Sequence, residues 1–148
     1  MATYLVADSG STKTDWCLIK KGKKPTRFST VGINPYLQSR EAIVEMLQRE
    51  LPWDNAKYKA DNMSYFGAGA ANPEKQAFLK DILKAHFGIK NTEVQGDMVA
   101  AARALCGDEK GIVCILGTGS ASCFYNGKRR KDQRPSLGYI AGDEGGGN

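Results

Sequence analysis

A short polar segment between two apolar runs constrains the fold of this chain more than any other feature. Residues 4–7 are apolar, residues 8–14 read Asp-Ser-Gly-Ser-Thr-Lys-Thr, and residues 16–19 are again mostly apolar. Two such runs around a polar turn are typical of a β-hairpin. The turn has more donors than a hairpin needs. Gly10 lets a ligand approach the backbone, consecutive N–H groups can form a hollow that binds anions, and the hydroxyls and Lys13 add donors.

Asp8 is an unfavourable neighbour for a phosphate unless a cation lies between them. Mg²⁺ binds through one or two carboxylates together with phosphates and keeps several waters, so it would fit here. The segment therefore predicts a turn that holds nucleotide phosphates and their metal. An ordinary turn would be the better explanation of this stretch taken alone, because Ser, Thr, Gly and Asp are common in turns. A Walker A loop is excluded, since Thr12 precedes Lys13 and a strand follows.

The composition is that of a globular protein with one real core. The 148 residues are 41% hydrophobic and 25% charged, which is ordinary for such a domain. No apolar run is long enough to span a membrane, and the N-terminal residues lack the pattern of a secretory signal. Four cysteines are scattered without a C-x-x-C pair, which favours reduced thiols in a cytoplasmic protein over disulfides or a zinc site: Cys17, Cys106, Cys114 and Cys123.

The net charge of +5 raises the question of a nucleic-acid partner. The basic residues cluster in two segments, 20–24 and 128–131, and neither is interleaved with aromatic residues as nucleic-acid surfaces often are. We therefore interpret both clusters as solvated hairpin tips and expect neither a nucleic-acid nor a membrane partner.

Hydrophobic periodicity and turn residues predict an α/β fold. The expected strands are 3–8, 14–20, 26–31, 63–66 and 92–95, and the expected helices are 38–51, 73–87 and 98–106. Asn72 and Asp97 are expected to cap the second and third helices, and Gly88 to end the second. The order β-β-β-α-β-α-β-α predicts a mixed five-stranded sheet with an antiparallel hairpin edge.

A second hairpin is predicted after residue 110. Residues 111–116 form an apolar run, Gly-Thr-Gly-Ser follows at 117–120, and residues 121–125 form the return strand. This segment looks like a second copy of the first hairpin, without its acid and its lysine. We therefore predict one lobe over residues 1–110 and the start of a second, incomplete lobe over residues 111–148.

Two glycine-rich hairpins with an aspartate at a strand-to-helix junction between them form a more specific pattern than any one piece. The pattern resembles the N-terminal portion of the N-acetylglucosamine kinase and BadF/BadG ATPase family, in the actin/hexokinase/Hsp70 ATPase superfamily with its ribonuclease H-like lobes. The residues that carry the resemblance are 8–14, 96–97, 117–120 and 142–145.

The resemblance implies ATP-dependent phosphorylation of an amino sugar, N-acetylglucosamine or a related hexosamine. Asp97 would be the general base that accepts the proton of the sugar hydroxyl; a plain helix cap is the alternative. Asp8 would hold Mg²⁺ through water. The first phosphate motif would comprise Asp8, Ser9, Gly10, Ser11, Thr12, Lys13 and Thr14. The second would comprise Gly117, Thr118, Gly119 and Ser120. The sugar would be bound by Asn34, Gly138, Asp143 and Glu144.

Several alternatives stay open. Asn34 precedes Pro35, so an ordinary turn residue is as good an explanation as a sugar ligand. Leu137 and Tyr139 stand where the amino-sugar kinases often carry Trp and His, which leaves the identity of the sugar open. A BadF-type activator ATPase and a non-catalytic nucleotide- or sugar-binding module are the competing functions, and the dispersed cysteines argue against the activator.

The resemblance also implies that most of the second lobe lies beyond residue 148. We therefore expect little or no kinase turnover from this chain alone, because nucleotide is held between two lobes that close on it. The strand at 112–116 would lack its covering layer, which favours self-association and makes a homodimer the candidate assembly.

Overall fold

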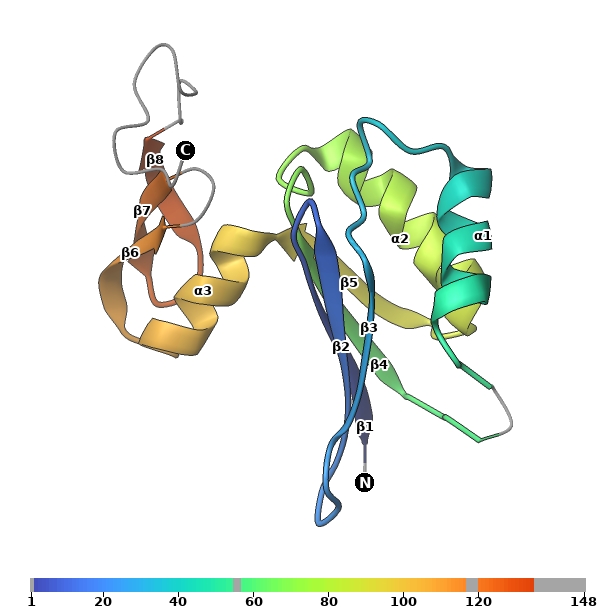
Figure 1. Ribbon diagram of the computed structural model, residues 1–148. Helices are drawn as coiled ribbons and strands as arrows, with labels where there is room; N and C mark the ends of the chain where they lie inside the picture. Colours follow the sequence, from blue (N-terminus) through green and yellow to red (C-terminus); the bar gives the residue numbers. More distant parts are fainter. Residues whose placement is uncertain (1, 55–56, 117–119, 135–148) are drawn as a thin grey trace. The chain divides into compact units, whose positions relative to one another are not determined.

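The computed structural model describes residues 2–54, 57–116 and 120–134, and it divides into two compact units, Met1–Asp97 and Met98–Asn148. Each unit is described by itself (Figure 1). The division falls just after the first residue of the third helix, whereas the sequence placed that whole helix with the first lobe. The two-lobe organisation of the whole protein stays a prediction.

The first unit is built on a five-stranded mixed sheet in the order β3-β2-β1-β4-β5. The first three strands pair antiparallel, while β4 and β5 run parallel to β1. This is the predicted sheet, and its antiparallel part lies at one edge as expected. The strands are β1 (Thr3–Ser9), β2 (Lys13–Lys20), β3 (Thr26–Val31), β4 (Asn62–Gly67) and β5 (Asn91–Gly96).

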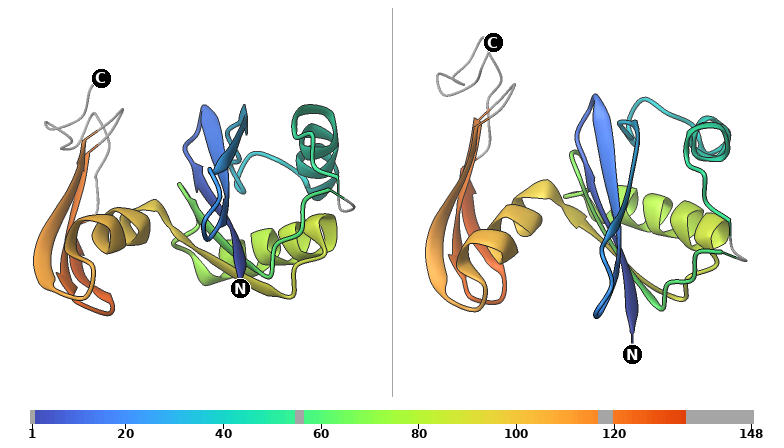
Figure 2. Two further views of the ribbon diagram at one scale, coloured as in Figure 1. Left: turned by 90° about the horizontal axis from the view of Figure 1, so that it is seen from below. Right: turned by 60° about the horizontal axis from the view of Figure 1, so that its bottom comes forward.

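Both helices of this unit, α1 (Arg40–Glu50) and α2 (Pro73–Phe87), lie on the same side of the sheet (Figures 1 and 2). The strand β1 shows why, because its residues alternate between buried and more exposed. Leu5 and Ala7 point into a core that α1 and α2 complete, whereas Tyr4 and Asp8 lie on the opposite face. Trp16 from β2 packs near the ring of Phe87 at the end of α2, with ring centroids 5.3 Å apart. Burial of this apolar surface is the main driving force for the unit.

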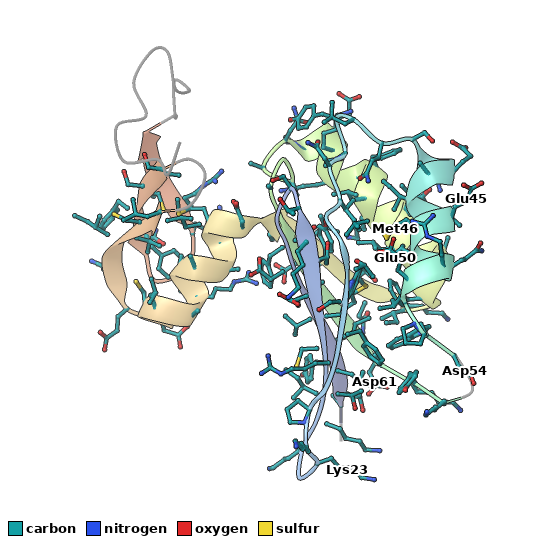
Figure 3. The ribbon with its side chains drawn as sticks, viewed as in Figure 1. Lys23, Glu45, Met46, Glu50, Asp54 and Asp61 are labelled. Carbon is teal, nitrogen blue, oxygen red and sulfur yellow. The ribbon has the colours of Figure 1, made fainter. Side chains whose placement is uncertain are left out.

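Capping residues in the local sequence set the ends of the two helices. The Ser39 hydroxyl accepts the Ala42 N–H at 3.2 Å and caps α1, and Asn72 caps α2 with Pro73 as its first residue. Gly88, in the left-handed conformation, ends α2 as predicted. Glu50 at the end of α1 reaches the edge of the sheet, where its carboxylate accepts the Val31 N–H at 2.8 Å (Figure 3).

The second unit pairs one helix with a small antiparallel sheet in the order β6-β7-β8. Met98 and Ala102 of the helix form its core with Val113, Cys123 and Tyr125. Gly111 is in tight contact with this helix, because a Cβ there would lie 2.7 Å from the Cys106 sulfur. The elements are α3 (Asp97–Cys106), β6 (Lys110–Leu116), β7 (Ser120–Asn126) and β8 (Arg130–Arg134).

Strand β8 was not predicted. Residues 128–131 were expected to form a solvated turn, but β8 begins at Arg130 and pairs antiparallel with β7. The turn itself is shorter and is closed by the Asn126 side chain, which accepts the N–H groups of Lys128 and Arg129. A basic strand has no apolar alternation, so its pairing with β7 could not be recognised from pattern.

No helix in the described part of the chain has both the length and the apolar character needed to cross a bilayer.

Candidate functional site

The turn between β1 and β2 is held in place by the backbone. The Gly10 N–H donates to the Lys13 carbonyl at 2.8 Å, and the Gly32 N–H donates to the Thr12 carbonyl at 2.9 Å. Gly32, which follows β3, lies so close to the turn that a Cβ on it would be 2.3 Å from the Gly10 carbonyl oxygen. The loop after β3 therefore packs directly against the turn, and a residue larger than glycine at position 32 would displace the turn.

Two hydroxyls of the predicted phosphate motif are turned into the protein. Ser9 and Thr14 are fully buried and their oxygens lie 2.7 Å apart. Ser9 Oγ accepts the Ile33 N–H at 3.2 Å, and Thr14 Oγ1 donates to the Val31 carbonyl at 3.2 Å. Because the Thr14 hydroxyl donates its proton to Val31, the Ser9 hydroxyl is the donor in the bond between the two side chains. This chain of hydrogen bonds links β1, β2 and the end of β3. These side chains fix the turn, and the exposed side chains of the motif are those of Asp8, Ser11, Thr12 and Lys13.

Three carboxylates stand around this turn. Asp8 and Asp15 are paired across β1 and β2, and Asp97 lies close enough to influence Asp8. Partial burial raises the pKa of Asp8, and the negative charges of Asp97 and Asp15 raise it further. Asp15 is held differently: Lys13 donates to it at 2.8 Å and Ser29 at 2.7 Å, and these hydrogen bonds lower its pKa.

The position of Asp97 follows from the register of the parallel strands. Ser9 pairs with Gly67 and Gly67 pairs with Gly96, so β1, β4 and β5 end at the same edge of the sheet. Asp97 comes next as the first residue of α3, one position inside the helix rather than before it. It is half-buried and lies at the N-terminus of the helix. The structure thus brings Asp97 close enough to Asp8 to act on it electrostatically, although the two residues are far apart in sequence. Their roles in a kinase site stay predictions.

The donor set fits a hydrated magnesium ion with phosphate ligands. Partial burial raises the pKa of Asp8, and the negative charges of Asp97 and Asp15 raise it further; a divalent cation would offset both costs of the ionised carboxylate. Among the described residues no three His, Cys, Asp or Glu side chains converge as a complete metal cage. Mg²⁺ does not require one, since it keeps several waters and takes only one or two carboxylates.

Asn34 acts as a turn residue in the loop after β3. Its Oδ1 accepts the Tyr36 N–H at 3.0 Å, and its backbone N–H donates to Gln38 Oε1 at 2.7 Å. These contacts are those of an ordinary turn residue, which was the alternative explanation of Asn34. Its role as a sugar ligand stays a prediction, which would use the side-chain amide nitrogen.

The rest of the predicted site lies largely outside the described residues. Ser120 is described and begins β7, where it pairs with Leu116. Gly117, Thr118, Gly119, Gly138, Asp143 and Glu144 fall in the segments that the structure does not describe. That the two glycine-rich turns face one another stays a prediction.

Sequence reasoning missed two residues that shape the site. Gly32 was expected only to lie in a loop, but its lack of a side chain is what allows the turn at residues 10–12 to pack against that loop. Tyr65, fully buried on β4, has a hydroxyl without a hydrogen bond of good geometry in the described part of the chain. Burial raises its pKa to about 12. Its ring fills the space under Gly67, where a Cβ would lie 2.7 Å from the ring. No local pattern marks either residue, because both depend on segments distant in sequence.

Comparison with solved structures places the chain in a known fold class. The chain has the actin-like ATPase fold, which is the α/β class predicted from its motifs. MreB 5 of Spiroplasma citri, solved with AMPPNP bound, matches 90% of the chain and 52% of its own at a TM-score of 0.66 with 11% identity. At that identity the likeness concerns the fold alone.

Within this class the chain is similar to a putative N-acetylglucosamine kinase from Porphyromonas gingivalis. The two are 45% identical over 97% of this chain and 51% of the other, at a TM-score of 0.87. A second protein of the same description, from Chromobacterium violaceum, is 17% identical over 97% of this chain and 52% of its own, at a TM-score of 0.66. The first match confirms the resemblance to N-acetylglucosamine kinases that was inferred from the motifs, whereas the second, at 17% identity, concerns the fold alone.

The chain spans about half the length of these solved structures. No protein-family model matches the sequence, and no curated protein does.

Proposed function

We infer that this chain forms part of a sugar kinase that transfers phosphate from ATP to N-acetylglucosamine or a related hexosamine. The observation that carries the proposal is the meeting of Asp8 and Asp97 at one edge of the sheet, beside the turn at residues 10–12. Ligands bind at this edge in open α/β sheets, beyond the carboxyl ends of the parallel strands. The 45% identity to the Porphyromonas gingivalis protein supports the choice of a sugar kinase over the other functions of the fold.

The exposed residues of the turn are suited to hold phosphate. Ser11 and Thr12 offer hydroxyls and backbone N–H groups at an open surface. Asp8 would hold Mg²⁺ through water, and the ion would neutralise charge on the phosphates when bound. Lys13 is engaged with Asp15, so in this arrangement its charge offsets a carboxylate rather than pointing freely into solvent.

Asp97 is the residue proposed to accept the proton of the sugar hydroxyl. A general base must lie where the sugar hydroxyl arrives, and Asp97 follows β5 at the edge of the sheet where β1 and β4 also end. A cation bound at Asp8 would offset the negative charges gathered around Asp8 as well as those of the phosphates.

A chimera tests the proposal, because the chain matches one half of a longer protein. The matching half of the Porphyromonas gingivalis protein is replaced by this chain, and ADP release is measured with and without N-acetylglucosamine. The proposal expects sugar-dependent ADP release in the chimera and in the parent. An active parent with a folded but inactive chimera would contradict it.

The assignment of the base is tested in the same chimera. Asp97→Asn should lower the rate by about a hundredfold or more, the range of general-base loss, while sugar binding is retained. Glu45→Gln, an exposed carboxylate on α1, is the matched control and should leave the rate unchanged (Figure 3). A loss below about tenfold for Asp97→Asn would show that the base is elsewhere.

A further inference from the structure

A lysine-lined cavity lies at the end of the sheet opposite to the proposed kinase site. It has a volume of about 440 Å³ and is bordered by Thr3 at the start of β1, Leu18 on β2 and Tyr58 before β4. The turn at Gly10 follows the other end of β1, about 20 Å away by the rise of a seven-residue strand. Lys23, at the tip of the β2–β3 hairpin, and Asp61, before β4, mark this end in Figure 3. The cavity is thus separate from the site described above.

The charge of the cavity is strongly unbalanced. Five of its lining residues are lysines, and its one acid is Asp61. The Asp61 carboxylate already accepts the Thr3 N–H at 2.7 Å. Within the described residues none of these lysines forms an ion pair. The five are Lys20, Lys23, Lys24, Lys57 and Lys59.

The lysines come from two segments that are distant in sequence. Three belong to the β2–β3 hairpin, which the sequence analysis explained as a solvated tip. The other two, Lys57 and Lys59, come from the segment between α1 and β4 and line the same hollow. All five lysines are exposed, so water screens their charges, but a solvated hairpin tip alone does not explain why a second, distant segment lines the same cavity with lysines. An anion in the cavity would offset the remaining repulsion between them.

The shape of the cavity favours a small ligand over a polymer. Its volume lies within the range of small-molecule sites. The Tyr58 ring is already packed edge-on against Phe28 at 5.3 Å, and Lys57 Nζ lies 5.1 Å from its centroid. An aromatic ring held in this way does not provide the open stacking surface that single-stranded nucleic acids use. Ammonium groups are, in contrast, common binders of phosphate as point charges.

We propose that this cavity binds a compact, multiply phosphorylated metabolite, such as an oligophosphate or a sugar bisphosphate. The ligand would place its phosphates between the hairpin lysines and those of the segment before β4. The proposal does not depend on the kinase activity, because it uses different residues at a different end of the sheet.

Titration of the chain with inorganic triphosphate, followed by calorimetry and by amide chemical shifts, tests the proposal. Wild type should bind, and amide shifts should include Thr3, Thr26 and Asp61. Lys23→Gln/Lys24→Gln and Lys57→Gln/Lys59→Gln should each weaken binding about five- to thirtyfold, the range for two partly screened charge pairs. The matched control is Lys21→Gln/Lys128→Gln, which removes the same charge from exposed positions outside the cavity and should change the affinity less than twofold.

The same titration separates this site from the proposed nucleotide site. The proposal would be overturned if triphosphate changed the amide chemical shifts only at residues 9–13 and bound both double-lysine variants of the cavity as tightly as wild type. An equal loss in the control variant would also overturn it, because it would reveal a general effect of charge. A short single-stranded RNA is titrated in parallel, and binding of the RNA tighter than that of triphosphate at matched salt would reject the small-ligand assignment.

Discussion

At the scale of single residues, the glycine that the turn cannot lose is Gly32 rather than Gly10. The sequence drew attention to Gly10, yet a Cβ there would meet nothing closer than the Lys13 carbonyl oxygen at 3.7 Å. A Cβ on Gly32 would lie 2.3 Å from the Gly10 carbonyl oxygen and 2.5 Å from the Ser11 carbonyl carbon. The neighbours are backbone atoms, which cannot rotate away.

We expect Gly32→Ala to lower the free energy of unfolding by about 1–3 kcal/mol, the range for overpacking a well-packed site. Gly10→Ala is the control and should change it by less than about 0.5 kcal/mol, as for a surface position. Urea unfolding of both variants measures the difference. Equal effects of the two substitutions would contradict the structural role of Gly32.

Asp8 gives a second expectation at this scale. Its pKa is raised above the usual 3.8 by burial, Asp97 and Asp15. The folded chain therefore holds the Asp8 proton more tightly than the unfolded chain, and ionisation of Asp8 opposes folding. This destabilisation is fully present above the folded pKa and disappears as the pH falls through that pKa toward 3.8.

Asp8→Asn should consequently raise the melting temperature at pH 7, and the gain should vanish near pH 3.5. Millimolar Mg²⁺ should stabilise wild type and leave the variant almost unchanged if Asp8 holds the ion. Thermal unfolding over pH 3.5–8, with and without Mg²⁺, provides the measurement. A lower melting temperature for Asp8→Asn at pH 7 would show that the carboxylate stabilises the fold instead.

At the scale of elements, the N-terminal cap of α2 contributes to the stability of the helix. Asn72 Oδ1 accepts the Glu74 N–H at 2.8 Å and the Lys75 N–H at 3.3 Å. Both donors would otherwise lack a partner in the helix. The helix then buries Leu79, Ile82 and Leu83 against the sheet, so its first turn helps to position part of the core.

Replacing Asn72 by Ala should lower the free energy of unfolding by about 1 kcal/mol, the usual contribution of an N-cap. Asn72→Asp keeps an acceptor oxygen at the same place and should retain most of the stability. Chemical denaturation followed by far-ultraviolet circular dichroism compares the three proteins. If the Asp variant lost as much as the Ala variant, the cap would not explain the effect.

At the scale of the whole molecule, the second unit exposes an apolar face. Ile112 and Leu116 on β6 are 78% and 75% exposed, and Phe124 on β7 is 37% exposed. They lie on the face opposite the core that α3 completes. Exposed apolar strands favour association with other chains.

We therefore expect the 148-residue chain to associate as its concentration rises. Light scattering from micromolar to near-millimolar concentration measures the mass, and Ile112→Thr/Leu116→Thr should shift association to higher concentration because it removes the apolar contact. Tyr4→Thr, on an exposed face of the first unit, is the control. A monomer across the whole range would contradict this expectation.

The sequence by itself determined the order and nearly the bounds of the elements up to β7. Apolar alternation marked β1, Asn72 and Gly88 marked the ends of α2, and the motifs indicated the fold class before any coordinates. These signals are local, since each depends on residues within one or two turns of chain. They also drew attention to Asp8 after the apolar run at residues 4–7 and to Asp97 at a strand-to-helix junction, whereas the role of each came from the family resemblance.

Only the tertiary structure decided which distant residues meet. Gly32 supports the turn at residues 10–12, the buried hydroxyls of Ser9 and Thr14 join three strands, and Lys57 and Lys59 reach the cavity beside the β2–β3 hairpin. Strand β8 likewise exists because β7 offers it an edge, not because its own residues favour a strand. Such contacts depend on the packing of segments far apart along the chain, which no local pattern of side chains encodes.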